Sequence, residues 1–490
     1  TVGSILAHRP YQLLRYLYPN VKKAIFDPHC NGLLNMGIPD DDFHFIDHHL
    51  AHVTAAYSAS PFENALALSY GGFAPHADGT NAAGAVYRCR GSDIQWIADI
   101  PMCAAGCWFS GITVALGFRY MQQESKTMGL AALGDPDVCY EFCSALSTRY
   151  RSGEWQRYSY WLDYILSPRK PVFMGSHSGR GLKRILVTKS RQDLAAAAQC
   201  IWQENILSFV RDLVRRYSIG NLILSGGTFQ NIIVNTALAH SPGIDAVYVH
   251  PHPGDGSTPI GAALQFYQRQ SGILPRAPLY DTGLGCEFND PTIEHFIKQY
   301  KNRLQYKKIQ QISEYTASRL SEDRIIGWFQ GREEYGSRSL GHRCILAAPK
   351  GQLRDIINMK IKKREDWIPL GVSCLTAQAG GMFEQFVPSP YASFRFQFKP
   401  EYRSQYESIL HRDGTVRVHS VNQNTFQPFH QLLQVFYRKT GHPLILNSSL
   451  NRHGMPIVHT PDHALELLLT TQMDELIIGS YSVRVRADNI

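Results

Sequence analysis

Apolar residues in the first half of the chain fall in short runs that end at glycines. "NALALSYGG" (Asn64–Gly72) is one such run, and "NLILSGGTFQN" and "AVYVHPHPGDG" repeat the pattern. Apolar runs bounded by glycine turns are typical of buried strands. "SGITVALGF" and "RQDLAAAAQCIWQENILSFVRDLVRRYS" carry helical patterns, and "AAGAVYRCRGSDIQWIADIP" predicts two strands around a turn at Arg90–Gly91. This alternation predicts an α/β unit.

The second half differs in pattern and composition. "SGILPRAPLYDTGLGCEFNDP" (Ser271–Pro291) is rich in Gly, Pro and Asp, which is typical of a linker. A helix is expected near 292–304, and "DRIIGWFQG" and "HPLILNSSLN" read as strands in a region richer in Arg, Lys and His. We expect two α/β domains, residues 1–275 and 311–490, joined by a linker at 276–310.

Composition narrows the class of protein. The chain has 490 residues, 44% of them hydrophobic and 18% charged, as in soluble globular proteins. It contains no apolar run of about 18 residues and no basic-then-apolar start, so we expect a cytoplasmic protein without a membrane span. The first residue is Thr1 rather than Met. The ten cysteines include no CxxC, which argues for a reducing compartment and against a zinc ribbon.

The net charge of +8 is modest for this length. No block of Lys and Arg with interleaved aromatic residues is present, so the sequence argues against a nucleic-acid groove. The positive charge fits small anionic ligands such as nucleotides or phosphates. The three strand–glycine turn–helix units suit the same ligands, because glycine admits phosphate close to backbone N–H groups.

Two histidines in "FIDHHLAHVTAAY" (Phe45–Tyr57) have the spacing of a metal clamp. His48 and His52 would share one face of a helix. The chain holds 20 His, however, and the pairs His44/His48 and His459/His463 have the same spacing. Spacing alone therefore leaves a metal site and a chance pairing both open.

Cationic side chains gather at turns in the second half. "GREEYGSRSLGHRCIL" (Gly331–Leu346) holds three arginines among glycines, a combination that suits phosphate or carboxylate. Further polar residues follow at strand and turn boundaries. The set is Arg332, Arg338, Arg343, Lys362, Lys363, Arg364, His411, Arg417, Asn447, Ser448 and Asn451. One such cluster could be a solvated face, but together they predict a polyanion pocket.

Several of these pieces occur together in one known family. "DHHLAHVTAAY", "ESKTMGLAALGDP", "LSGGTFQN", "HPGDGSTPIGAAL", "GWFQGREEYGSRSLGHR", "IKKREDW", "DGTVRV" and "PLILNSSLN" follow one another in the family's order. On these motifs the chain resembles the O-carbamoyltransferases of natural-product and nodulation-factor biosynthesis, over nearly its whole length.

The resemblance implies an actin/sugar-kinase-like first domain, similar to threonylcarbamoyl transferases, followed by a YrdC-like adenylation domain. It implies that ATP, with Mg²⁺, and carbamoyl phosphate give carbamoyl-adenylate. The carbamoyl group then passes to a hydroxyl of a small-molecule acceptor, a secondary metabolite such as an antibiotic, at Fe²⁺ or another divalent metal. A homodimer is compatible with this pattern.

Site residues follow from the same resemblance. It implies His48, His52 and Asp255 as metal ligands, and catalytic roles for Arg338, Lys362 and Asp255. The remaining implied residues would contact the nucleotide or its phosphates. They are Glu124, Lys126, Ser225, Gly226, Gly227, Asn231, Arg332, Arg343, Arg364, His411, Arg417, Asn447 and Asn451.

The chain departs from the family pattern in three places. Gly71 of "SYGG" stands where the family has an aspartate ligand, and Tyr70 is a candidate replacement. The family's N-terminal hairpin, with its His–Asp pair, has no counterpart before Thr1. His453 and Met455 replace a basic residue and a glutamate.

Two other functions stay open. One is a diverged homologue that uses another adenylate or serves as a nucleotide-binding partner subunit. The other is a tRNA-modifying threonylcarbamoyl enzyme.

Overall fold

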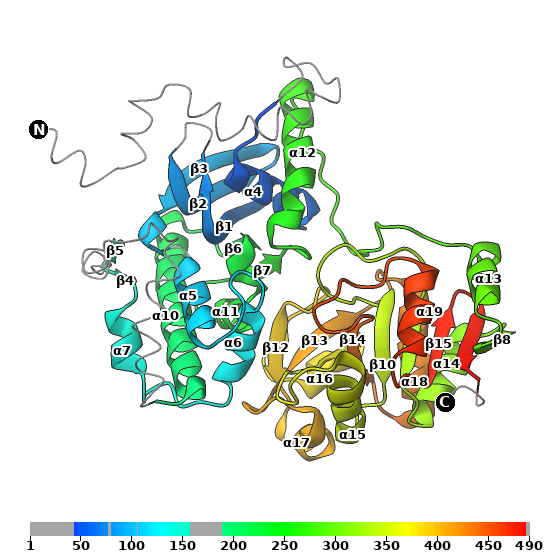
Figure 1. Cartoon of the computed structure of the whole chain (residues 1–490). Helices are drawn as coiled ribbons and strands as arrows, with labels where there is room; N and C mark the ends of the chain where they lie inside the picture. Colours follow the sequence, from blue (N-terminus) through cyan, green and yellow to red (C-terminus); the bar gives the residue numbers. More distant parts are fainter. Residues whose placement is uncertain (1–43, 77–79, 105, 157–188, 487–490) are drawn as a thin grey trace, which may run out of the picture.

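The computed structural model describes residues 44–76, 80–104, 106–156 and 189–486. Two sheets organise these residues, one of five strands in the first half and one of nine strands in the second (Figure 1). Helices pack against both sheets, and a separate hairpin joins β4 to β5. The predicted α/β class is confirmed.

The first unit follows the order expected from the sequence. Its elements are α4 (His48–Ala59), β1 (Asn64–Pro75), β2 (Asn81–Arg90), β3 (Asp93–Ile100), α5 (Cys107–Ala115), α6 (Glu124–Ala131), α7 (Tyr140–Ala145), β4 (Arg149–Arg151), β5 (Glu154–Gln156), α10 (Arg191–Tyr217), β6 (Asn221–Ser225), α11 (Ile232–Ala239), β7 (Ala246–Val249) and α12 (Thr258–Ser271). The strand order is β3-β2-β1-β6-β7, with β1, β6 and β7 parallel. The predicted turn at Gly91, where φ is +60°, joins β2 to β3.

Strand β1 separates two helical layers. Ala65 and Ala67 pack with Tyr57 of α4, while Leu66, Leu68 and Tyr70 pack into the larger core that contains the apolar face of α10. Alternate residues of a strand point to opposite faces, so this division follows directly from the strand period. The layer with α4 and α12 carries the histidine motif.

The second unit is built on the nine-stranded sheet. Its elements are α13 (Asp290–Gln299), β8 (Leu304–Lys308), α14 (Ile312–Ser321), β9 (Ile326–Phe329), β10 (Arg343–Ala347), α15 (Gly351–Asp355), a π-helix (Ile356–Lys362), β11 (Gly371–Leu375), α16 (Thr376–Met382), β12 (Phe394–Gln397), α17 (Pro400–Tyr406), β13 (Thr415–Val421), α18 (Gln427–Thr440), β14 (Leu444–Ser449), α19 (Pro461–Leu469), β15 (Glu475–Ile478) and β16 (Tyr481–Val485). The strand order is β12-β13-β11-β14-β10-β9-β15-β16-β8.

The parallel and antiparallel directions of the strands place the cationic motifs at one end of this sheet. Strands β11 and β13 run parallel and start at Gly371 and Thr415, whereas the antiparallel neighbour β14 ends there, with Asn447 opposite Gly371. Residue 343 begins β10 beside the same end of β14. The basic motifs are therefore neighbours in space although they span more than a hundred residues of sequence.

An extended segment joins the two units between α12 and α13, as Figure 1 shows. The helix α13 and the strand β8 fall within the 276–310 range, and β8 is an edge strand of the second sheet, paired with β16. The extended part thus lies between Gly272 and Asn289.

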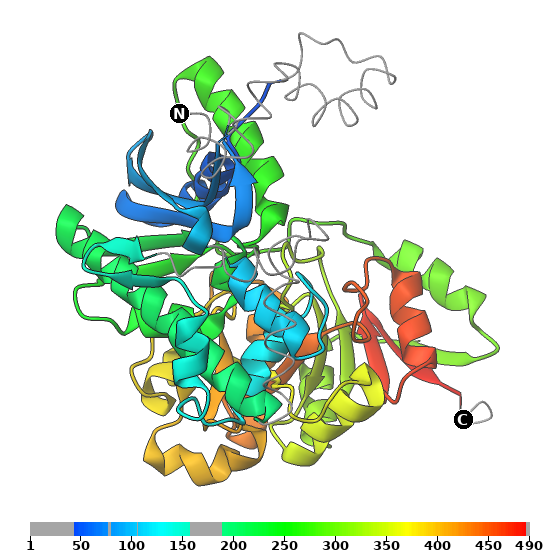
Figure 2. The same cartoon turned by 60° about the vertical axis from the view of Figure 1, so that its left-hand side comes forward.

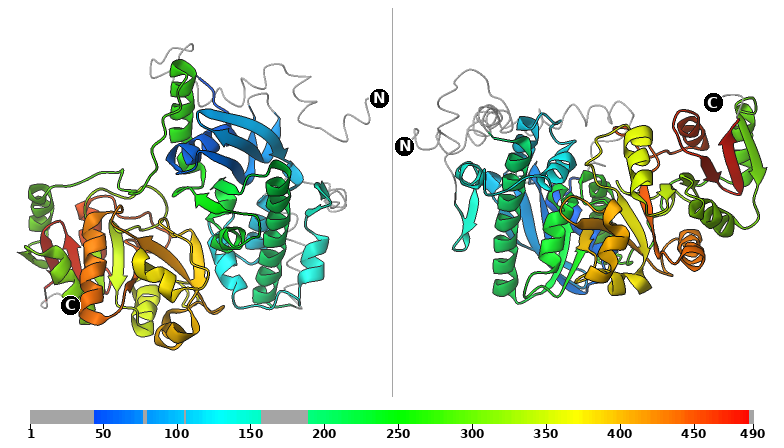
Figure 3. Two further views of the ribbon diagram at one scale, coloured as in Figure 1. Left: turned by 180° about the vertical axis from the view of Figure 1, so that it is seen from behind. Right: turned by 90° about the horizontal axis from the view of Figure 1, so that it is seen from below.

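The two units also touch directly. Asn235 of α11 donates to the carbonyl of Ser393, at 3.2 Å, and Thr236 accepts from the backbone N–H of Arg395, at 2.9 Å. The rings of Tyr248 and Tyr391 meet at 5.9 Å between centroids. Figures 2 and 3 show the two units in contact from further directions, with the cyan helices α5 and α6 over the second unit in Figure 2.

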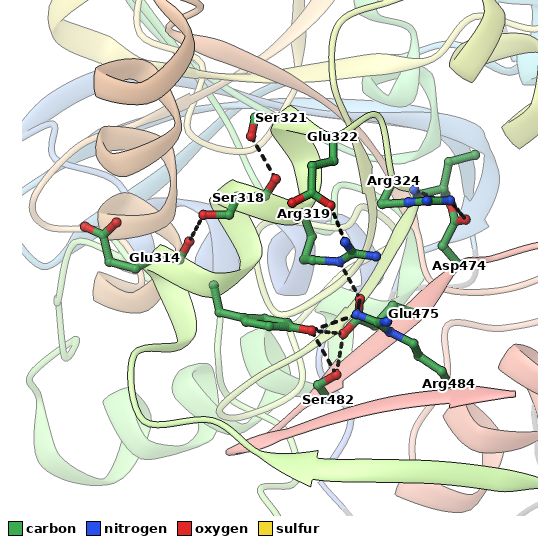
Figure 4. Close-up of polar contacts among 12 residues, drawn as sticks. Glu314, Ser318, Arg319, Ser321, Glu322, Arg324, Asp474, Glu475, Ser482 and Arg484 are labelled. Carbon is green, nitrogen blue, oxygen red and sulfur yellow. Dashed lines mark hydrogen bonds and ion pairs between the residues drawn. The ribbon is translucent and has the colours of Figure 1, made fainter. Parts of the chain in front are cut away.

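A buried carboxylate anchors the far end of the second sheet. Glu475 of β15 is fully buried, and it accepts hydrogen bonds from Arg319, at 2.9 Å, Arg484, at 2.9 Å, and Tyr315, at 2.7 Å (Figure 4). Ser482 donates to it as well. Strand β15 pairs with β9, which leads into the arginine motif.

Candidate functional site

Helix α4 presents the two predicted histidine ligands. Its N-cap is Asp47, whose carboxylate accepts the backbone N–H of Leu50 at 2.9 Å and contacts His76 at 2.7 Å. His48 and His52 lie one turn apart, with ring centroids 4.7 Å apart. The intervening His49 faces elsewhere, because its Nδ1 contacts the hydroxyl of Ser69 at 3.0 Å.

The glycine turn after β7 brings Asp255 to these histidines. Asp255 Oδ1 lies 3.3 Å from His52 Nε2 and 3.8 Å from His48 Nε2. On its other side, His52 Nδ1 lies 3.1 Å from the hydroxyl of Ser257, which fixes the ring with Nε2 toward Asp255. The structure thus assembles the three predicted metal ligands from segments about 200 residues apart.

The donor set fits a divalent cation. One ligand atom from each of His48, His52 and Asp255 lies within 4.8 Å of the others. This spread is slightly larger than the roughly 4.2 Å between two atoms bound at about 2.1 Å on opposite sides of one ion, so small side-chain rotations would bring all three onto one cation. Burial lowers the pKa of His48, and the hydrogen bond with His52 lowers the pKa of Asp255. Both groups are therefore in the deprotonated form that metal binding needs.

Tyr70 of strand β1 does not face the predicted metal ligands. The side chain of Tyr70 is fully buried on the α10 face, and its hydroxyl donates to the carbonyl of Ala104 at 2.8 Å. Tyr70 as a replacement ligand is therefore wrong, because the strand turns it away from α4. A Cβ on Gly71 would meet only the backbone nitrogen of Gly227, at 3.8 Å, so the structure has room for a side chain there.

Four cations of the second unit lie close together, Lys362 buried and three arginines half-buried. We call Arg338, Lys362, Arg364 and Arg417 the basic pocket. Arg338 and Arg364 both lower the pKa of Arg417, in addition to the effect of its burial. Burial, Arg364 and Arg417 together lower the pKa of Lys362 well below its ordinary value. None of the four pairs with a carboxylate within the described ranges, an arrangement that favours an anionic ligand.

Lys362 ends the π-helix, a distortion that often marks functional sites. Its ammonium group donates to the hydroxyl of Ser449 at 3.0 Å and to the carbonyl of Asn451 at 2.9 Å. It also donates to the Ser449 carbonyl and the Asn451 side chain. The predicted residues Lys362 and Asn451 are thus in direct contact, and Ser449 is a partner that the sequence did not reveal.

Gly371 packs directly against Arg417 of the basic pocket. A Cβ at this position would approach the Arg417 guanidinium to about 3.0 Å, so a larger residue would displace it. Nearby, Asn447 donates to the hydroxyl of Ser373 at 2.8 Å and accepts from Ser339 at 3.0 Å. His411 lies beside the Leu370 carbonyl, and burial lowers its pKa to about 4. Asn447 and His411 are therefore neutral groups whose contacts lie near the start of β11.

Two predicted arginines lie outside the basic pocket. Arg343 is fully buried, donates to the carbonyls of Gln330 and Gly331, and stacks on Phe329 at 3.6 Å. Arg332 is exposed and donates to the Leu284 carbonyl at 3.0 Å. Both hold the motif loop rather than face Arg338.

The predicted residues at the glycine turns of the first unit also have internal partners. Asn231 caps α11, accepting from the backbone N–H groups of Ile233 and Val234. Ser225 donates to the Leu68 carbonyl, and Glu124 accepts from Ser110 at 2.7 Å. Gly226 lies against β1, where a Cβ would come 2.4 Å from the Tyr70 carbonyl, while the space beside Gly227 is open.

Lys126 connects the first unit to the basic pocket. Its ammonium group contacts Glu365 at 2.7 Å, and Glu365 directly follows Arg364. Three residues further along α6, a Cβ on Gly129 would lie 3.2 Å from the Trp367 ring. Glu365 and Trp367 belong to the quoted "IKKREDW" motif, but their contact with α6 could not be predicted from the sequence.

Two family models match the chain, one in each unit. The family model for the carbamoyltransferase N-terminus matches residues 16–264, and the model for the carbamoyltransferase C-terminus matches residues 317–485. The chain belongs to the carbamoyltransferase family. The resemblance found in the sequence motifs is confirmed.

The relatives of this chain include nodulation proteins. Nodulation protein NolNO of Sinorhizobium fredii is 30% identical over 90% of the chain, which spans 64% of that relative. Nodulation protein NolO of Bradyrhizobium diazoefficiens is 29% identical, over 90% of the chain and 79% of the relative.

Among solved structures, full-length HypF in its phosphate- and nucleotide-bound form is 17% identical. It covers 47% of this chain and 44% of its own, with a TM-score of 0.27, an overlap too limited to support an argument.

Within the described ranges, no helix combines the length and hydrophobicity needed to cross a bilayer.

Proposed function

We propose that the chain is an ATP-dependent O-carbamoyltransferase that makes carbamoyl-adenylate in the basic pocket and transfers the carbamoyl group near His48, His52 and Asp255. The main support is the basic pocket itself. Lys362 is buried and Arg338, Arg364 and Arg417 are half-buried, none of the four forms an ion pair with a carboxylate in the described residues, and a polyphosphate would relieve the repulsion among them. The proposal includes an actin/sugar-kinase-like first domain and a YrdC-like second domain.

Formation of carbamoyl-adenylate would take two steps. Carbamoyl phosphate loses inorganic phosphate to water and leaves carbamate. A carbamate oxygen then attacks the α-phosphorus of ATP, and pyrophosphate leaves with Mg²⁺. Arg338, Arg364 and Arg417 would neutralise the phosphate charge that develops. Lys362, held by its hydrogen bonds to Ser449 and Asn451, would orient the nucleotide.

Transfer would follow at the first unit. The acceptor hydroxyl attacks the carbamoyl carbon, AMP leaves, and the hydroxyl proton passes to solvent or base. His48, His52 and Asp255 would hold Fe²⁺ or a similar cation, which would polarise the carbamoyl carbonyl when bound. The contact between Lys126 and Glu365 brings the first unit to the rim of the pocket where the adenylate forms.

Exchange of pyrophosphate into ATP tests the adenylation step. The full chain should catalyse exchange that depends on carbamoyl phosphate, and Arg338→Ala or Arg417→Ala should reduce it at least about 100-fold, because each removes a charged hydrogen-bond partner and its field. Arg412→Ala, which changes an exposed arginine near Arg417, is the matched control and should retain exchange. Full exchange in both pocket variants would contradict the assignment. A folded wild-type chain that shows none would favour the partner-subunit alternative.

A further inference from the structure

The loop that carries Arg338 also touches the turn that carries Asp255. Tyr335 of this loop donates its hydroxyl to the carbonyl of Gly256, at 3.1 Å, and Gly256 directly follows Asp255. The Tyr335 ring packs on two histidines of the same turn, at 5.8 Å from His250 and 5.6 Å from His252. One side chain of the second unit thus covers the ligand-bearing turn of the first.

The backbone around Tyr335 fits closely on both sides. Gly336 has a φ of +116°, and a Cβ there would lie 2.8 Å from the Pro251 carbonyl, so glycine permits this approach. The backbone N–H of Tyr335 donates to the Thr282 carbonyl, at 2.6 Å, in the linker. Tyr335 is therefore held between the linker and the turn rather than resting on the surface.

The Asp255 side chain is the most exposed of the three predicted metal ligands. It is 79% exposed, and the residue stands between two glycines, Gly254 and Gly256, which leave the turn many backbone conformations. His52, by contrast, is 2% exposed and fixed by Ser257. Asp255 is thus the ligand whose position is least restricted by its own surroundings.

We propose that Tyr335 is a positioning residue for the metal site: its hydroxyl holds the Gly256 carbonyl and so keeps the Asp255 carboxylate facing His48 and His52. This inference rests on the proposed function, because it assumes that the three residues bind a cation. Burial raises the pKa of Tyr335 to about 12, so its phenol keeps the proton that it donates.

Calorimetric titration with Fe²⁺ in the absence of oxygen tests the inference on the full chain. Tyr335→Phe removes one hydroxyl and keeps the ring, so the dissociation constant for Fe²⁺ should rise about threefold to tenfold, the range expected for one hydrogen bond. Tyr391→Phe is the matched control. It loses a phenol that donates to the Leu279 carbonyl at the same interface but touches neither Asp255 nor Gly256.

The outcomes separate the inference from the proposal on which it rests. Weaker Fe²⁺ binding in Tyr335→Phe, with the control unchanged and both variants folded by circular dichroism, supports the inference. If Tyr335→Phe binds Fe²⁺ as tightly as the wild type, the inference is wrong and the metal site is unaffected. If Tyr335→Phe and Tyr391→Phe weaken binding equally, the inference is also wrong, because the effect is then a general loosening of the interface. A wild-type chain that binds Fe²⁺ no better than His52→Ala overturns the metal site and the inference together.

Discussion

Replacing Glu475 by glutamine should destabilise the second unit measurably. The carboxylate is fully buried, and two arginines, a tyrosine and a serine donate to it (Figure 4). Glutamine is nearly isosteric, but it removes the charge that Arg319 and Arg484 neutralise and turns one acceptor into a donor facing other donors. Removing one partner of a buried ion pair costs about 3 to 5 kcal/mol.

The expected fall in the midpoint of thermal unfolding follows from this energy. We take about 3 kcal/mol, because glutamine keeps one acceptor oxygen and Arg484 is partly exposed. For a unit of roughly 200 residues, each kcal/mol shifts the midpoint of thermal unfolding by about 2 to 4 °C. The midpoint for this unit should therefore fall by about 6 to 12 °C at pH 7, measured by scanning calorimetry.

A neighbouring acid provides the control. Asp474 is partly exposed, pairs with Arg324 at 3.1 Å and accepts the backbone N–H of Ile325. Asp474→Asn keeps an acceptor for that N–H and loses only a surface ion pair, worth about 1 kcal/mol at most. If Glu475→Gln lowers the midpoint no more than Asp474→Asn does, the reasoning about the buried carboxylate is refuted.

The pH dependence gives the same prediction a second check. Burial alone would raise the pKa of Glu475, but its hydrogen bonds with Ser482, Tyr315, Arg484 and Arg319 lower it below the ordinary value of 4.5. A lowered folded-state pKa gives stability that is present above the unfolded value and is lost as the pH falls through the folded value. The difference between wild type and Glu475→Gln should therefore shrink as the pH falls below about 4.5.

Three further predictions concern the site and the domain boundary. Gly71→Asp should tighten Fe²⁺ binding in calorimetry and His52→Ala should remove it, because the first adds a carboxylate where a Cβ fits and the second removes a ligand; unchanged affinity in His52→Ala would make these histidines structural. Lys126→Met should lower carbamoyl transfer to an acceptor several-fold while leaving pyrophosphate exchange nearly intact, since it breaks the contact with Glu365 at the rim; equal loss of both would place Lys126 in the adenylation step. Limited proteolysis should cut first within the extended segment 272–289, which carries the exposed side chains of Tyr280 and Leu284, and a first cut within 221–261 would contradict this boundary.

The sequence predicted the elements well because their signals are local. The strand at Asn64, the helix from Arg191 and the turn at Gly91 all lie where apolar runs, helical periodicity and glycine indicated. The spacing of His48 and His52 could not identify a site by itself, because Asp255 lies about 200 residues away. The resemblance named all three, and the fold brings them together.

The roles of single residues were harder to predict because they depend on tertiary packing. Arg338 and Arg343 look alike in the motif, but strand β10 buries Arg343 against Phe329, whereas Arg338 adds to the effect of burial in lowering the pKa of Arg417. Asn231 did carry a usable local signal, because an asparagine directly before an apolar helix is a strong N-cap. Tyr70 was misjudged because it directly precedes Gly71, and neighbouring residues of a strand point to opposite faces, so it packs toward α10 rather than toward the histidines.

The most direct test of the central claim is pyrophosphate exchange by the full chain with ATP, Mg²⁺ and carbamoyl phosphate, without an acceptor. We expect exchange that requires carbamoyl phosphate and is lost in Lys362→Met, a variant that nearly keeps the length of the side chain and removes its charge. A folded wild-type chain that exchanges no pyrophosphate, or a Lys362→Met variant that exchanges at the wild-type rate, would contradict the claim that the basic pocket makes carbamoyl-adenylate.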